Sequence, residues 1–309
     1  MSANLLAASL EFDLNTWCRQ QLLLVEAALS KWVNDPAATP GAAVLVHAMR
    51  YAVLDGGKRL RPLLVLAACE GVQGVPESAM RAACAVELIH AYSLVHDDMP
   101  CMDNDVLRRG KPTVHVRFGQ AHALLAGDAL QALAFEILVP DDESYLPGPV
   151  QSRLCRLLAQ ASGFQGMAGG QAIDLASVGQ RLDVDQLHTM HRLKTGALLK
   201  ASVLMGASCG EASKSTLAAL AGYGAAIGLA FQVVDDILDV TADSATLGKT
   251  AGKDAAHDKP TFVSLLGLDA SRNYATALLN EALDCLEAAQ LHHSDALRAL
   301  AYMVVNRAY

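Results

Sequence analysis

Helical spacing of apolar residues along nearly the whole chain is the feature that most limits its possible folds. Apolar residues recur at steps of three and four, as at Leu154, Leu157 and Leu158. Strand-like alternation is nearly absent, and Ala, Leu, Gln and Glu, which dominate these stretches, lose little conformational entropy in helices. The sequence therefore predicts an all-α fold with about ten or more helices.

The breaks between helical segments do not divide the chain into separate domains. Gly, Pro, Asp and Ser gather in four stretches that we interpret as loops, namely residues 34–41, 71–76, 140–149 and 241–260. No linker or repeat of fixed period is present, so we predict a single domain over residues 1–309. The last loop is long for a compact domain and carries Lys249 and Lys259, so we expect it to act as a basic flap.

Charge and cysteine usage exclude several classes of function. The formal charge is −8 with no run of Lys and Arg, which disfavours nucleic acid as a partner because such binding needs a basic surface. The seven cysteines are scattered and form no CxxC pair, which argues against a disulfide framework and a zinc site. The N-terminus does not resemble a secretory signal, so we expect a cytoplasmic protein.

One segment meets the length criterion for a membrane span. Residues 215–234 carry no formal charge. Three glycines and Gln232 interrupt this segment, and Asp235 and Asp236 follow it at once, which favours a buried core helix instead. We therefore expect no membrane span.

Two acidic clusters, each after an apolar helical run, indicate where chemistry takes place. They contain Asp97, Asp98, Asp103 and Asp105 in HDDMPCMDND, and Asp235, Asp236 and Asp239 in VVDDILDV. Pro100 disfavours helical geometry at Met99, which places Asp97 and Asp98 in the last turn of a helix. Carboxylates there are unfavourable without a cation, because they face the negative end of the helix dipole.

Clustered oxygen ligands suit Mg2+, which typically bridges one or two carboxylates to substrate phosphates. The alternative for a single isolated cluster is a solvated helix end, and the presence of two clusters favours the metal. Basic residues beside glycines supply a complementary half that could bind diphosphate. They lie in GGKRLRP, in RRGKPT and in KTG, although each motif alone is also compatible with a solvated turn.

The motifs of this chain form an ordered set that is more specific than any one of them alone. The ordered set is GGKRLRP, ELIHAYSLVHDDMPCMDNDVLRRGKPT, GDAL, HRLKTGALL, FQVVDDILDV, LGKTAGKD and KPT. It resembles the trans-prenyl diphosphate synthases, in particular their bacterial farnesyl-forming type. The resemblance implies a helical bundle around a central cavity, a homodimer, and three Mg2+ ions held by the two acidic clusters.

The resemblance also assigns roles to individual residues. The implied metal ligands are Asp97, Asp98, Asp103, Asp235, Asp236 and Asp239, and the implied catalytic set is Asp97, Asp98, Asp103, Lys194, Asp235 and Asp236. The allylic diphosphate would contact Arg108, Lys194, Thr195, Gln232, Lys249 and Lys259. Isopentenyl diphosphate would bind Lys58, Arg61, His90 and Arg109. The residues alone favour a core histidine at His90, whereas the resemblance favours a diphosphate ligand, and we interpret His96 as structural.

Product length should depend on the helix that ends in the first acidic cluster. Tyr92 lies about 7.5 Å of helix axis before Asp97 and, with Ser93, would form the floor of the cavity. The resemblance then implies farnesyl diphosphate as the product, with geranylgeranyl diphosphate as the alternative. A terpene cyclase would not need two basic sets, and a non-catalytic partner subunit should have damaged acidic clusters. Both clusters are intact here.

Overall fold

A computed structural model describes residues 12–34, 39–54, 56–180, 182–241 and 260–306. Its N-terminal half comprises α1 (Leu14–Trp32), α2 (Pro40–Val53), α3 (Leu60–Gly71), α4 (Pro76–Asp97), β1 (Leu107–Arg108), β2 (Lys111–Pro112), α5 (Val114–Phe118), α6 (Gln120–Glu136) and α7 (Gly148–Ser162). The rest comprises α8 (Met167–Ala176), α9 (Val184–His191), the π-helical turn η1 (Arg192–Gly196), α10 (Ala197–Ala207), α11 (Lys214–Thr241), α14 (Phe262–Leu266), α15 (Leu268–Ala288) and α16 (Asp295–Val305). The predicted all-α fold is confirmed.

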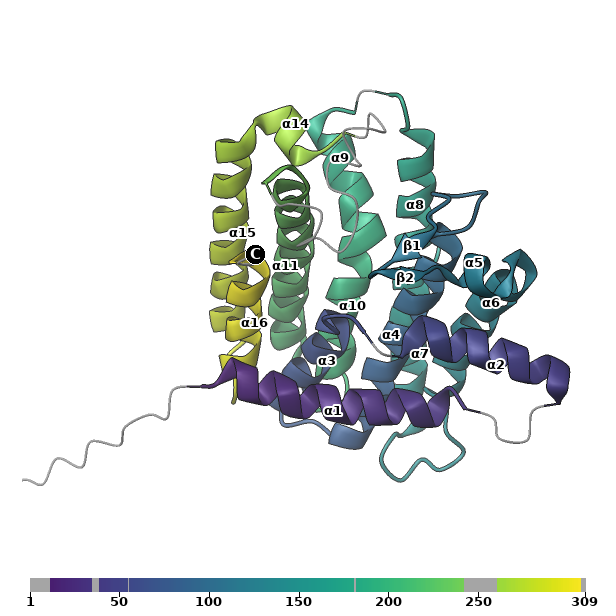
Figure 1. The fold of residues 1–309 in the computed structure, drawn as a ribbon. Coiled ribbons are helices and arrows are strands. Elements are labelled where there is room, and N and C mark those ends of the chain that lie inside the picture. The colour runs from purple at the N-terminus through teal and green to yellow at the C-terminus, as the bar shows by residue number, and fades with distance from the viewer. Residues whose placement is uncertain (1–11, 35–38, 55, 181, 242–259, 307–309) are drawn as a thin grey trace, which may run out of the picture.

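The long helices stand side by side, and α1 lies across their lower end (Figure 1). Helix α4 packs between α3 and α6, while α10 packs against both α3 and α11. Most of the buried apolar side chains form one cluster that extends from α1 to α16, and a smaller cluster surrounds Phe262. The two acidic clusters therefore lie on helices that belong to the packed interior.

Helix α11 contains the uncharged segment 215–234. By length and hydropathy it could cross a membrane, and half of its most apolar window is buried in the fold. It packs along α15 and α10, and the fully buried hydroxyl of Tyr223 donates a hydrogen bond to the carbonyl of Leu297, 2.7 Å away. Helix α11 is thus in contact with several neighbouring helices of the fold.

Two local elements were not predicted from the sequence. The short hairpin β1–β2 turns through Arg109 and Gly110, whose φ angles of 52° and 73° are typical of a type I′ turn. The five residues of η1 form a π-helical turn between α9 and α10. At Gly228 of α11 an added Cβ would lie 2.8 Å from the Cα of Gly196, so these glycines allow α11 and η1 to approach closely.

Candidate functional site

The first acidic cluster surrounds the C-terminal end of α4, as predicted. Asp97 is the last helical residue, Asp98 is the C-cap, and the amide of Asp103 donates a hydrogen bond to the carbonyl of Asp97, 2.9 Å away. Burial raises the pKa of Asp97 to about 6, the charge of Lys194 opposes this effect, and the charge of Asp103 adds to it. Asp97 therefore lies within electrostatic reach of both Asp103 and the π-turn.

Asp98 is held differently from Asp97. Its side chain is buried, and both of its carboxylate oxygens accept hydrogen bonds from the Arg108 guanidinium at 2.5–2.9 Å. Arg108 belongs to β1, so this ion pair ties the hairpin to the end of α4. Such a bidentate pair fixes the orientation of both partners.

The second acidic cluster lies in the last turns of α11, where Asp236 and Asp239 are buried. One oxygen of Asp236 accepts a hydrogen bond from Gln232 Nε2 at 3.0 Å, and the other accepts one from the amide of Phe262 at 2.8 Å. Phe262 is itself held in a ring cluster with His188, His191 and Tyr274. The anchoring role of Phe262 was not predicted, since an isolated KPTF segment carries no sign of it.

The π-turn connects the two clusters. Lys194 Nζ lies 2.5 Å from a carboxylate oxygen of Asp174, and its charge acts on the pKa of Asp97. The hydroxyl of the next residue, Thr195, donates to Gln232 Oε1 at 3.2 Å, and Gln232 in turn holds Asp236. Thr195 and Gln232 thus connect the π-turn to Asp236 by hydrogen bonds, and Lys194 lies within electrostatic reach of Asp97.

Asp174 is a site residue that sequence reasoning missed. It lies on α8, is only 7% exposed, and holds the ammonium group of Lys194. The segment GGQAID before and around it carried a signal, because an added Cβ at Gly170 would overlap the backbone of Lys194. A glycine followed by a carboxylate one helical turn later indicates close packing that brings the acid to the lysine.

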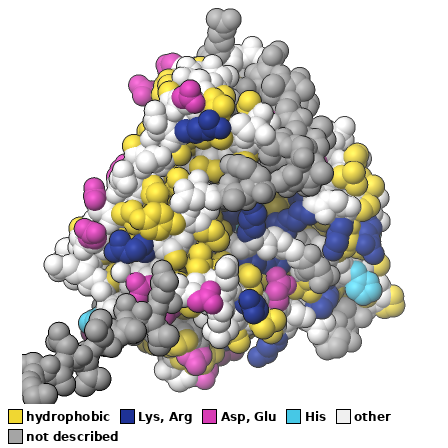
Figure 2. Space-filling model, turned by 60° about the vertical axis from the view of Figure 1, so that its left-hand side comes forward, with side chains coloured by type: hydrophobic (Ala, Val, Ile, Leu, Met, Phe, Trp, Pro, Cys, Tyr) yellow, Lys and Arg dark blue, Asp and Glu magenta, His cyan; other side chains and the backbone are white. Residues whose placement is uncertain are grey.

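Three of the predicted basic residues, Arg61, His90 and Arg109, lie within electrostatic reach of one another. Burial lowers the pKa of His90 well below its usual value, and the nearby charges of Arg61 and Arg109 lower it further. An added Cβ at Gly57, whose φ is +100°, would lie 2.7 Å from the Arg109 guanidinium, so the glycine loop and the hairpin meet. Figure 2 shows several Lys and Arg side chains near one another across the middle and right of one face, with others apart from them on the left.

Arg59 of the basic motif GGKR is held within the core. It is buried and binds Glu26 and Glu87 at 2.7 and 2.6 Å and the carbonyl of Val53 at 2.5 Å. Its guanidinium is therefore a structural cation that joins three segments of the core.

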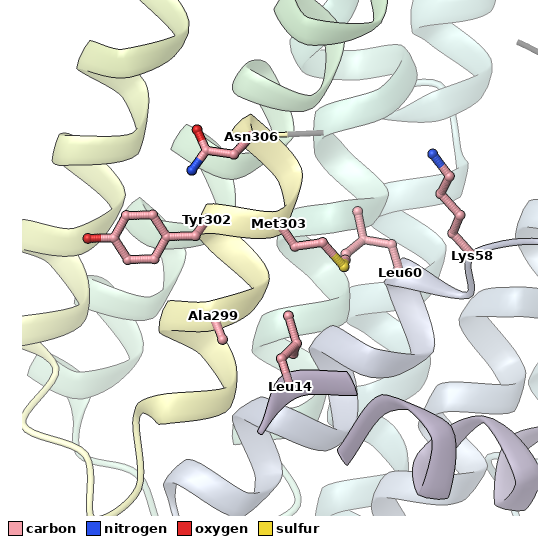
Figure 3. A pocket seen from close by; sticks show the side chains of 7 residues that line it. All are labelled: Leu14, Lys58, Leu60, Ala299, Tyr302, Met303 and Asn306. Carbon is pink, nitrogen blue, oxygen red and sulfur yellow. The ribbon is translucent and has the colours of Figure 1, made fainter. Parts of the chain in front are cut away.

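Lys58 stands at the edge of a separate apolar groove of about 590 Å3 between α1, α3 and α16 (Figure 3). Leu60 and Met303 point toward one another across this groove, and the side chain of Lys58 lies next to it. The aspartates of the two clusters are not among the residues that line it. Two further predicted residues, Lys249 and Lys259, lie outside the described part of the chain, as does most of loop 241–260.

The carboxylates fit a Mg2+ ion for which the protein supplies only part of the coordination. Among the described residues, no three His, Cys, Asp or Glu side chains are brought together closely enough to hold a metal by themselves. The available donors are hard carboxylate oxygens, and one of them, on Asp97, has a raised pKa because burial disfavours its charge. An arrangement of this kind suits an ion that takes part of its coordination from substrate phosphates and water.

Comparisons with known proteins agree with this geometry. The profile of the family described as polyprenyl synthetase matches residues 42–300. A "Probable farnesyl diphosphate synthase" of Sinorhizobium fredii is 52% identical over 270 residues, which are 86% of this chain and 80% of that protein. A chloroplastic geranylgeranyl pyrophosphate synthase of Capsicum annuum is 44% identical over 290 residues, 93% of this chain and 78% of that protein.

A solved structure is also similar to this chain. The crystal structure of an FPP/GFPP synthase from Zymomonas mobilis superposes with a TM-score of 0.82 at 44% identity. The alignment covers 94% of this chain and 98% of that one.

Proposed function

The chain belongs to the polyprenyl synthetase family, and on this premise we propose that it condenses isopentenyl diphosphate with dimethylallyl and then geranyl diphosphate to give (2E,6E)-farnesyl diphosphate. The observation that carries the proposal is the position of the π-turn, where Thr195 reaches Asp236 through Gln232 and the charge of Lys194 acts on Asp97. A basic set around His90, Arg61 and Arg109 is available for a second diphosphate. Two anionic substrates thus have separate binding groups.

Mg2+, when bound at Asp97, Asp103, Asp235 and Asp239, would supply positive charge that stabilises the departing diphosphate. We give Asp98 and Asp236 a positioning role within the metal site, because Arg108 holds both oxygens of the first, and Gln232 and Phe262 hold those of the second. Three ions per site remain the expectation.

The reaction follows from the charges of the side chains. Lys194 and Arg108 neutralise the allylic diphosphate as its C–O bond breaks, which is electrostatic stabilisation by preorganised groups. Arg61, Arg109 and His90 hold isopentenyl diphosphate so that its double bond forms the new C–C bond to the allylic cation. The proton lost in this step passes to the released diphosphate. Apolar side chains around Tyr92 exclude water, which would otherwise quench the cation.

The direct test is an incubation with dimethylallyl diphosphate, radiolabelled isopentenyl diphosphate and Mg2+, followed by dephosphorylation and separation of the alcohols. Farnesol that disappears with EDTA is the expected product. Geranylgeraniol would favour the alternative product, and the absence of any metal-dependent condensation would favour a non-catalytic partner subunit.

Replacing Tyr92 with Ala should lengthen the main product from fifteen to twenty carbons. Tyr92 is half-buried on α4, and its pKa is raised by burial and by the charge of Asp97, so its ring lies near the metal end of the site. Removal of the ring opens space for one more isoprene unit. The measurement is the geranylgeraniol-to-farnesol ratio, with Tyr302→Ala on the exposed side of α16 as a control. A purely fifteen-carbon product at undiminished activity would refute the role of Tyr92.

The Mg2+ requirement should rise as the pH falls through about 6. The folded-state pKa of Asp97 is raised to about 6, so the carboxylate is charged above this pH and takes up a proton below it. Because metal binding competes with this proton, the Mg2+ concentration for half-maximal rate should rise about tenfold between pH 7 and pH 5. Titration of the substrate phosphates also changes the Mg2+ requirement, and it does so equally in the Asp97→Asn variant. The residual rate of this variant therefore provides the baseline for the part that does not depend on Asp97. Equal pH dependence in both proteins would contradict the prediction.

We also propose a homodimer in the cytoplasm, with residues 1–309 forming one polyprenyl synthase domain. Exposed apolar side chains on α5 and α6, namely Val116, Leu124 and Leu125, support a partner at this face. Light scattering should give twice the chain mass of 32.6 kDa. Leu125→Arg should shift the protein toward the monomer, whereas Leu265→Arg, at another exposed leucine, should leave it unchanged.

A further inference from the structure

The imidazole of His96 lies against the ring that we propose as the floor of the product cavity. His96 and Tyr92 are four residues apart on α4 and so share one helix face. Their ring centroids are 5.8 Å apart with an interplanar angle of 77°, which is an edge-to-face contact. Each side chain is half-buried. The Tyr92 ring is therefore in contact with a neighbour on the same face of α4.

Helix α6 holds the other side of the imidazole. His96 Nε2 lies 3.1 Å from the carbonyl oxygen of Leu124. A carbonyl can only accept, so Nε2 carries the proton in this contact and the neutral ring is sufficient. The bond fixes the His96 ring to the backbone of a neighbouring helix.

A glycine makes room for this arrangement. Gly127 of α6 is buried, and a Cβ at this position would overlap the imidazole of His96. The motif GDAL thus begins with a residue whose missing side chain provides the space for His96. Leu124 and Gly127 are three residues apart, so one face of α6 supplies both the hydrogen bond and the space.

We propose that His96 is a positioning residue for Tyr92. Its contacts with the Leu124 carbonyl and with Gly127 determine product length through the position of the Tyr92 ring. The inference rests on the proposed function, because it concerns the length of the prenyl chain that this site makes. Without the imidazole, the Tyr92 ring loses its edge contact and can turn into the vacated space. The cavity then gains depth although Tyr92 itself is retained.

The test compares His96→Ala and His96→Gln with the unaltered enzyme, using dimethylallyl diphosphate and radiolabelled isopentenyl diphosphate. Both variants remove the ring, while the glutamine amide can still donate to the Leu124 carbonyl and so preserves the tie between α4 and α6. The geranylgeraniol-to-farnesol ratio should rise about tenfold or more in both. This ratio is independent of total activity, so a partial loss of folded enzyme does not obscure it.

His122→Ala is the matched control. His122 is also half-buried, but its Nδ1 lies 3.1 Å from the carbonyl of Phe118 on α5, so this contact involves α5 and not Tyr92. It should leave the product ratio unchanged. The double variant Tyr92→Ala with His96→Ala should give the same ratio as Tyr92→Ala alone, because His96 acts only through Tyr92.

The outcomes separate the two proposals. If the unaltered enzyme makes farnesol but His96→Gln still makes only farnesol, the inference is overturned and the proposed function stands. An additive effect in the double variant would also overturn the inference, since it would place His96 in direct contact with the prenyl chain. If the unaltered enzyme forms no prenyl product, the proposed function itself fails.

Discussion

Replacing Asp97 with Asn should reduce the rate of condensation by about two to three orders of magnitude. The substitution keeps the size of the side chain and removes the charge that faces Lys194 and Asp103 at the end of α4. The site then loses one of its proposed metal ligands. Because the leaving diphosphate is stabilised less, the ionisation step should slow. The measurement is the initial rate at saturating substrates and Mg2+.

Asp284→Asn on the exposed side of α15 is the matched control and should retain the full rate. Circular dichroism should show equal helix content in both variants, because burial of the charged Asp97 disfavours folding and its removal does not. An Asp97→Asn enzyme with at least half of the original rate would show that this carboxylate is not a metal ligand.

Replacing Arg59 with Ala should cost about 3–5 kcal/mol of folding free energy. Arg59 and Glu87 are 3% and 2% exposed, and the guanidinium is the partner of Glu87 at 2.6 Å. Its removal leaves a buried carboxylate without its cation and also frees the carbonyl of Val53. Denaturant unfolding followed by circular dichroism measures the loss.

Arg272→Ala provides the comparison for a surface ion pair. Arg272 and Asp269 of α15 are 57% and 94% exposed, and they lie 3.6 Å apart. Such pairs contribute little, so this variant should unfold at the same denaturant concentration as the parent. Equal stability of the Arg59→Ala and Arg272→Ala variants would refute the structural role of Arg59.

The helical fold could be predicted because apolar periodicity repeats over many turns in nearly every segment. The loops around residues 34–41 and 71–76 could be placed because Pro40 and Pro76 begin helices α2 and α4. The hairpin β1–β2 was missed because it has only two residues per strand, too few for an alternating pattern. Gly110 after Arg109 was its one local signal.

For the site, residue type could be predicted better than role. Both aspartate pairs were recognised, but the sequence does not distinguish the first member of each pair from the second. Only the fold shows that Arg108 reaches back to Asp98 and that the amide of Phe262 meets Asp236. Likewise, Arg59 and Arg61 are indistinguishable in GGKRLRP until burial separates a core cation from a member of the basic set.

The π-turn has a consequence for how the two acidic clusters respond to change. Lys194 acts on Asp97 through its charge, and Thr195 reaches Asp236 through Gln232, so adjacent residues of one turn are coupled to both clusters. Effects of substitutions in contact networks of this kind are not additive. The two clusters should therefore behave as a single cooperative unit, in which ordering one carboxylate group lowers the free energy needed to order the other.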